Sequence, residues 1–385
     1  MTYNWLSMKS RKAAFIYSPE LEKYNYPPEH PFNITRATRV RKVINSMGLL
    51  SGPDRSEIPP EPAERIVLKK FHTARYLHAL KTVSKGKFDT EALGMGIGTS
   101  DCPVFSGLYD YSVLAAGGTL VAAKLLLTGS ADVAFNPSGG YHHAGPERAS
   151  GFCYINDVAL VCTILAEAGK RVLYLDVDVH HGDGVAYAFY DRSDVMTISF
   201  HETGRMLFPG TGFEDETGTG AGKGYCVNIP LPAGTFDEQY MKAFEAIALP
   251  LIKFYDPDVF VFELGADALA GDPLAHLQLT NNVYADIINH LLTFNKPILA
   301  TGGGGYNIEN TVRAWALAWN VLCGADSGND ANLGMGGVML ESTEWPGGLR
   351  DRTIAPSKAQ RNAVEPVIET TLEAVKANVF SIHGL

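Results

Sequence analysis

The sequence predicts a single three-layer α/β domain, in which a doubly wound, mostly parallel sheet lies between two layers of helices. Short apolar runs recur along the 385 residues without polar alternation, as expected for parallel strands that are buried on both faces. Segments with helical periodicity separate these runs, which favours right-handed β–α–β connections. The chain contains no repeat, no low-complexity tract and no Pro/Ser-rich linker, so we expect one domain over residues 1–385.

The predicted strands and helices alternate along the chain. Six apolar runs are expected to form strands: Ala13–Tyr17, Ala131–Phe135, Val172–Val177, Val195–Phe200, Val259–Leu264 and Ile298–Thr301. Five segments are expected to form helices: Ser112–Leu127, Asn156–Ala168, Glu238–Phe254, Asn281–Asn295 and Asn310–Leu322. Glycine-rich segments follow several of these strands, and long loops at strand ends commonly carry function.

The composition is that of a soluble globular enzyme, with 46% hydrophobic and 19% charged residues. The formal net charge of −10 argues against direct nucleic-acid binding. Five scattered cysteines without a CxxC pair indicate reduced thiols. There is neither a signal-peptide pattern nor an uninterrupted apolar stretch of membrane length, so we expect a cytoplasmic protein that does not bind membranes.

The segment Val172–Gly184, VLYLDVDVHHGDG, is the most informative part of the chain. Side chains at i and i+2 of a strand share a face, so Asp176, Asp178 and His180 are expected to project together. They would do so at the carboxyl end of a parallel strand, where ligands bind in open α/β sheets. The alternative is that these residues only begin a solvated turn.

A third metal ligand is expected from another strand end. The segment Pro257–Gly271, PDVFVFELGADALAG, predicts a strand, a glycine turn and then Asp267. The alternative for Asp267 is a helix N-cap. Two carboxylates and one imidazole would leave an open coordination position, which is typical of a catalytic metal site. Zn²⁺ is the first choice for this ligand set, and Fe²⁺ or Co²⁺ is compatible.

Two further segments carry candidate catalytic groups. In GGYHH (139–143), adjacent His142 and His143 would titrate as a coupled pair with one ring neutral, which suits a general base. Asp176 and Asp183 could hold their tautomers, although a pair of structural histidines is the alternative. The run ATGGGGY (300–306) lacks the pattern of a phosphate-binding loop, so Tyr306 is interpreted as an oxyanion donor, or else as a core residue.

Together these segments resemble the zinc-dependent histone deacetylase family of the arginase/deacetylase superfamily. The resemblance extends from about residue 13 to 322, is closest to class I-type enzymes and, within the family, to bacterial acetoin-utilisation-like deacetylases. Residues 323–385 are expected to be a C-terminal extension packed on the same domain. The motifs that carry the resemblance are TSDCPVF (99–105), GGYHHA (139–144), ASGFCYIND (149–157), LDVDVHHGDGV (175–185), FPGTG (208–212), GADALAGD (265–272) and GGGGY (302–306).

The resemblance implies a role for each matching position. The metal ligands would be Asp178, His180 and Asp267. The catalytic residues would be a general base and acid, its orienting carboxylate, a paired histidine with its carboxylate, and an oxyanion donor: His143, Asp183, His142, Asp176 and Tyr306. A narrow apolar tube for the acyl-lysine stem and a carboxylate at its rim would use Gly151, Phe152, Phe208, Leu274, Gly304 and Asp101.

The resemblance also implies two potassium sites. The site beside the metal would use side chains or backbone carbonyls of Asp176, Asp178, His180, Ser199 and Phe200. The distal site would use backbone carbonyls of Phe189, Arg192, Val195 and Tyr225. Because that contact is through the backbone, the arginine at 192 need not abolish it.

Some positions depart from the family pattern. Asn33, Pro273 and Glu309 stand where eukaryotic class I enzymes use basic residues to bind an inositol phosphate, so we expect no such co-repressor complex. Residues 145–147, Gly-Pro-Glu, replace the usual basic residues and would reshape the rim.

The predicted activity is metal-dependent hydrolysis of N-acetyl-lysine, or of another N-acyl-lysine, in proteins or peptides, which releases acetate. Three alternatives remain open: a deacetylase of small cations such as acetylpolyamines, a two-manganese ureohydrolase, and a catalytically inactive acyl-lysine reader. The preferred acyl chain, the native metal and the oligomeric state are open as well.

Overall fold

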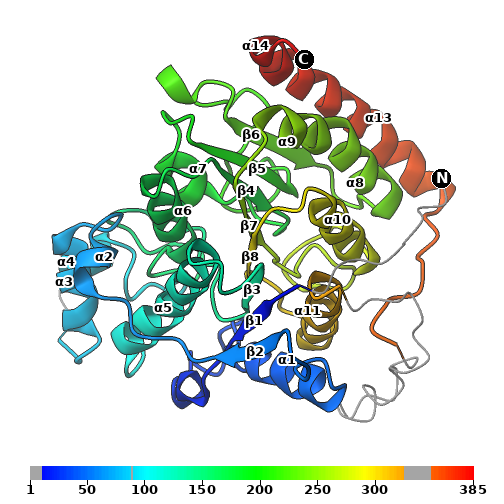
Figure 1. Cartoon of the computed structure of the whole chain (residues 1–385). Helices are drawn as coiled ribbons and strands as arrows, with labels where there is room; N and C mark the ends of the chain where they lie inside the picture. Colours follow the sequence, from blue (N-terminus) through cyan, green and yellow to red (C-terminus); the bar gives the residue numbers. More distant parts are fainter. Residues whose placement is uncertain (1–10, 88–89, 325–347) are drawn as a thin grey trace.

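The computed structural model describes residues 11–87, 90–324 and 348–385 (Figure 1). Its centre is one eight-stranded sheet with the strand order β2-β1-β3-β8-β7-β4-β5-β6. All pairs of neighbouring strands are parallel. The strands are β1 Ala13–Ile16, β2 Arg55–Ile58, β3 Val133–Asn136, β4 Val172–Asp176, β5 Val195–Glu202, β6 Cys226–Leu231, β7 Val259–Glu263 and β8 Ile298–Thr301.

All six predicted strands are present, with ends that differ by up to two residues. β4 ends at Asp176 and not at Val177, and β3 begins at Val133 and not at Ala131. The strands β2 and β6 were not predicted, and both lie at the edges of the sheet. β2 is the polar sequence RSEI, and β6 contains Pro230, which an edge strand tolerates because one side of it needs no ladder hydrogen bond.

The five predicted helices are also present. They correspond to α5 Leu108–Leu127, α6 Asp157–Glu167, the segment α8–α9, α10 Asn282–Thr293 and α11 Ile308–Leu322. The segment α8–α9 comprises α8 Asp237–Ala243, a π-helical turn at Phe244–Ala248 and α9 Leu249–Tyr255. The structure adds helices that were not predicted: α1 Thr35–Ser46, α2 Arg65–Leu68, α3 Ala74–Val83, α4 Thr90–Gly94, α7 Asp183–Ala188, α13 Lys358–Val375 and α14 Ser381–His383.

The alternation of side chains along each strand divides the apolar core between the two faces of the sheet. On β4, Leu173 and Leu175 join a core that also contains side chains of α1 and α8–α11. Val172 and Tyr174 join a core with α5, α6 and α7 on the opposite face. Figure 1 shows these two groups of helices on opposite sides of the sheet, with α13 beside β6 and α8. The structure is therefore the predicted three-layer arrangement.

The helix α5 is long and apolar enough to cross a membrane by length and composition, with a mean hydropathy of 1.3. Within the fold, however, 67% of that segment is buried. Its neighbours are β3 and α6, so its apolar surface is accounted for by the core of the domain.

Candidate metal centre and active site

A row of polar residues crosses six adjacent strands, and on β3, β8, β7 and β4 its member is the last residue of the strand. Residues that are paired across adjacent strands point to the same face of a sheet. Each residue of the row is paired with the one on the neighbouring strand. All of the side chains are buried. From β3 to β6 the row reads Asn136, Thr301, Glu263, Asp176, Ser199 and Asn228. The chain thus places polar groups in the interior at the edge where a ligand is expected in a parallel sheet.

Asp178, His180 and Asp267 lie just beyond this row. The Nδ1 atom of His180 is 3.2 Å from Asp178 Oδ1 and 3.0 Å from Asp267 Oδ2. Both carboxylates are held by the backbone: the N–H of Gly304 donates to Asp178 Oδ2 (2.6 Å) and that of Val179 to Asp267 Oδ1 (2.9 Å). Three predicted ligands from two chain segments therefore converge.

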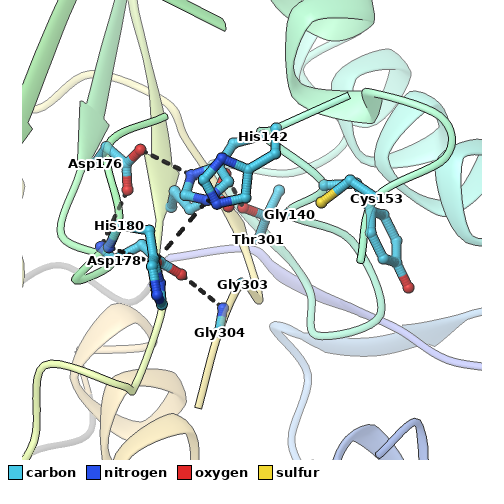
Figure 2. A network of polar contacts seen from close by, with 12 residues as sticks. Gly140, His142, Cys153, Asp176, Asp178, His180, Thr301, Gly303 and Gly304 are labelled. Carbon is cyan, nitrogen blue, oxygen red and sulfur yellow. Dashed lines mark hydrogen bonds and ion pairs between the residues drawn. The ribbon is translucent and has the colours of Figure 1, made fainter. Parts of the chain in front are cut away.

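The structure corrects two parts of the strand argument. Because β4 ends at Asp176, both Asp178 and His180 lie in the following loop and not on a strand. Asp176 does not join them: its side chain turns to His142, as Figure 2 shows. The helix N-cap alternative for Asp267 is wrong, because this residue lies in a turn and the next helix, α10, begins at Asn282.

The three converging residues fit a divalent metal ion. Their ligand atoms all lie within 4.8 Å of one another, and the side chains are buried. Burial lowers the pKa of His180, but the two carboxylates outweigh it and raise the pKa to about 10, so this position attracts positive charge. A Cβ at position 304 would lie 1.9 Å from Asp267 Oδ2, so only glycine allows the loop to pass here. Two oxygens and one nitrogen are ligands that Zn²⁺ accepts.

His142 and His143 form a hydrogen-bonded pair behind the metal ligands. Nδ1 of His142 is 3.0 Å from Asp176 Oδ2, and Nδ1 of His143 is 2.7 Å from Asp183 Oδ1. Each Nδ1 therefore carries a proton, because a carboxylate only accepts. The two Nε2 atoms are 2.9 Å apart, so one further proton lies between them and the pair carries one positive charge.

The surroundings of the two rings differ, and this assigns the shared proton. Burial lowers the pKa of His142, but the nearby carboxylates, Glu263 above all, outweigh it and raise the pKa well above its ordinary value. Burial and the charge of His142 lower the pKa of His143 to about 4, against the opposing effect of Asp183. The extra proton thus belongs to His142, and His143 is the neutral member of the pair.

Tyr306 follows the glycine run after β8. Its N–H donates to Asp272 Oδ2 (2.7 Å), and its ring lies edge-on to Phe152 with centroids 5.7 Å apart. Arg36 reinforces the run by donating to the carbonyls of Gly303 (3.0 Å) and Gly305 (2.8 Å). Burial, with the nearby acids, raises the pKa of the phenol well above its ordinary value, so it remains a hydrogen-bond donor.

Three of the predicted tube residues, Phe208, Gly151 and Phe152, lie against His143 or Tyr306. Phe208 is 44% exposed and lies edge-on to His143, with centroids 5.0 Å apart. A Cβ on Gly151 would lie 2.2 Å from the His143 ring, so this glycine allows the loop to approach the ring closely. Leu274 is half-buried, and its N–H is fixed by Asp272 (2.9 Å).

Asp101 and a separate cleft both lie beside the loops that surround His143. One oxygen of Asp101 accepts the N–H of Gly151 (2.8 Å), so this carboxylate also holds the loop beside His143. A cleft of about 450 Å³ opens next to His143 and Phe208. Asp183 borders this cleft and is 20% exposed, whereas Asp178 and Asp267, the candidate metal-ligand carboxylates, are buried.

The two potassium sites stay predictions. Ser199 Oγ contacts Nδ1 of His201 at 2.8 Å, and Nε2 of His201 contacts the carbonyl of Gly212, also at 2.8 Å. Nε2 must therefore carry the proton, the serine donates to Nδ1, and the lone pairs of Ser199 Oγ stay available for a cation. At the distal position, the side chain of Arg192 pairs with Asp194 (2.7 Å), which leaves the backbone as the candidate ligand.

Sequence reasoning missed Glu263. It is the last residue of β7 and is fully buried. Its Oε1 atom lies 3.3 Å from Nδ1 of His142, on the same ring nitrogen that contacts Asp176. The only signal in the sequence was one acidic residue at the end of an apolar run.

Comparison with known proteins identifies relatives over most of the chain. Residues 30–322 match the histone deacetylase domain model. The chain is 42% identical to the acetoin utilization protein AcuC of Bacillus subtilis (strain 168), over 83% of this chain and 84% of AcuC. It is 38% identical to histone deacetylase clr6 of Schizosaccharomyces pombe, over 84% of this chain and 79% of that protein. The crystal structure of an HDAC homolog from Aquifex aeolicus matches 95% of this chain and all of its own, with a TM-score of 0.84 and 33% identity.

Proposed function

Because the chain belongs to the histone deacetylase family, we propose that it hydrolyses the amide of N-acetyl-lysine, or of another N-acyl-lysine, in a protein or peptide. Membership of this family supports deacetylase activity, and the proposal adds that the substrate is an acyl-lysine. One observation supports the acyl-lysine substrate. Asp178, His180 and Asp267 converge near a neutral His143, and the apolar ring of Phe208 lies against one side of His143. A reader protein needs no such combination of a metal position and a base.

Asp178, His180 and Asp267 would hold the metal, which we propose to be Zn²⁺, with Fe²⁺ compatible. When bound, it polarises the amide carbonyl and acidifies the attacking water. Potassium beside the site is part of the same proposal, supported by the free lone pairs of Ser199.

The chain's own residues would move the protons. In the reaction the water replaces His142 as the hydrogen-bond partner of His143 Nε2, and His143 takes a proton there as the water oxygen attacks the carbonyl carbon. Asp183 stabilises the imidazolium that forms. Tyr306 donates a hydrogen bond to the oxyanion of the tetrahedral intermediate. His143 then returns its proton to the lysine nitrogen as the C–N bond breaks, which releases acetate and a free amine.

The rim would select a lysine side chain within a peptide. Phe152 and Phe208, together with Gly151 and Leu274, would enclose the four methylene groups of the lysine stem. Gly304 would line the bottom of the same tube. Asp101 would accept a backbone N–H from the peptide with the oxygen that does not hold Gly151.

We extend the proposal to partners and location. All five cysteines are free and buried, which supports a reducing compartment and hence the cytoplasm. Asn33, Pro273 and Glu309 supply no positive charge for an inositol phosphate, so a co-repressor complex of that kind is not part of the proposal. The net charge of −10 disfavours direct contact with nucleic acid.

Turnover of acetyl-lysine peptides, with and without a chelator, tests the proposal. We expect hydrolysis that the chelator abolishes and that added Zn²⁺ restores. Comparison of kcat/KM for acetyl-lysine, longer acyl-lysine and acetylpolyamine substrates then defines the class. A higher kcat/KM for acetylpolyamine would favour the small-cation alternative, and binding without turnover in the metal-loaded protein would indicate a reader.

A further inference from the structure

Glu263 is a buried carboxyl group for which the proposed mechanism has no role. Its position follows from the register of the sheet, because β7 lies between β4 and β8 and pairs Glu263 with Asp176 on one side and Thr301 on the other. Its exposed fraction is 0%. The same register brings its side chain to the face of the sheet that also carries Tyr174.

The two oxygens of Glu263 have different surroundings. Oε2 has a long contact of 3.5 Å with the hydroxyl of Thr301. It also lies 3.3 Å from the hydroxyl of Tyr174, whose single proton is donated to Asp176 Oδ2 at 2.6 Å. Oε1 makes no hydrogen bond of ordinary geometry within the described part of the chain. Oε1 lies 3.3 Å from Nδ1 of His142, which is a proton donor.

The Nδ1 edge of His142 thus lies between two carboxylates. Asp176 Oδ2 takes the shorter contact at 3.0 Å. The backbone of Gly182 packs against the Asp176 side of the ring, since a Cβ there would lie 2.4 Å from Asp176 Oδ2 and 3.2 Å from Nδ1 of His142. Glu263 Oε1 occupies the other side of Nδ1, at 3.3 Å.

A buried carboxylate oxygen with poor hydrogen bonding destabilises a fold. A well-packed apolar side chain of similar size at this strand end would avoid that loss. A buried polar group that lacks good hydrogen bonds is therefore more often found at a functional site than elsewhere in a fold.

We propose that Glu263 is a positioning residue for His142: with Asp176, it holds the ring from a second side and so fixes the place and orientation of this ring beside His143. Glu263 touches neither substrate nor metal ligand in this role and acts only through the histidine pair. The inference deepens the proposed function and rests on it, because its consequence for rate requires His143 to be the base.

Kinetics and stability together test this role. We expect Glu263→Leu to lower kcat by about 10- to 100-fold with little change in KM, the usual loss for a residue that orients a catalytic group. Its Tm should change little, because the loss of a poorly bonded carboxylate is offset by the loss of its attraction for the charged His142 ring. Glu263→Gln keeps the size and one acceptor oxygen, so it should recover kcat to within about fivefold of the unmodified protein.

Asp237→Asn is the matched control. Asp237 at the start of α8 is a partly buried carboxylate whose oxygen accepts the N–H of Thr280 at 2.8 Å, in a purely structural contact. Its substitution should lower Tm and leave kcat unchanged. A wild-type kcat for Glu263→Leu would overturn the proposal, as would a loss of kcat accompanied by a lower Tm or by loss of metal.

A spectroscopic measurement separates this inference from the proposed function. The Nδ1–H proton resonance of His142, identified by its disappearance in His142→Ala, should shift in Glu263→Gln, while that of His143 stays in place. This measurement needs no substrate. A shift in a protein that hydrolyses no acyl-lysine would reject the proposed function and retain the role of Glu263 in holding the ring; an unchanged resonance would reject that role even in an active enzyme.

Discussion

Tyr306→Phe is the sharpest test of the proposed chemistry, because it removes one oxygen and leaves the surroundings in place. The backbone N–H at position 306 stays bonded to Asp272, and the ring keeps its edge-on contact with Phe152. The glycine run stays fixed by Arg36. Substrate binding should therefore be nearly unchanged, and the loss should fall on the transition state alone.

The magnitude follows from the number of donors lost. One oxyanion donor contributes about 2.7–4 kcal/mol, which corresponds to a decrease in kcat of about 10²- to 10³-fold. Saturation kinetics with an acetyl-lysine peptide, together with metal analysis of both proteins, would measure this decrease. Tyr255→Phe is the control, because its hydroxyl contacts the carbonyl of Ser193 (3.3 Å) away from the site. Unchanged kcat in Tyr306→Phe, with full metal content, would refute the assignment.

Three further predictions concern metal, base and pH. Asp178→Ala should remove the bound metal, as measured by elemental analysis, because it deletes one of three ligands; full retention would contradict the ligand set. Asp183→Asn should lower kcat by about 10²- to 10⁴-fold with little change in KM, because the amide no longer fixes the proton of His143 on Nδ1. Burial lowers the pKa of His72 to about 3, and its Nε2 accepts the N–H of Asn156, so the folded state resists protonation that the unfolded chain undergoes below pH 6.5. Stability should therefore fall as the pH drops below 6.5, by about 2 kcal/mol at pH 5 relative to pH 8, and urea denaturation should show that His72→Gln lacks this component.

Much of the site could be predicted because its chemistry is local in the chain. Val172–Gly184 carries two of the three candidate metal ligands and the carboxylate partners of both histidines, so one apolar run that ends in acids indicated most of the candidate centre. The continuous apolar runs likewise predicted the inner strands, since strands buried on both faces cannot alternate. The edge strands β2 and β6 were missed for the opposite reason: one side of each has no neighbour in the sheet, and their polar residues and proline do not resemble a strand.

The amino-acid sequence was sufficient to predict the fold class, the family resemblance and the identity of the metal-ligand candidates. The choice between the alternatives at Asp267 required the folded structure, because a turn and a helix start can have the same local sequence but place the carboxylate differently. The folded structure also brought Glu263 to His142, through the register of β7 against β4. The physical reason is that pairing between strands depends on packing across the whole sheet, and residues separated by more than a hundred positions come into contact only when that packing is complete.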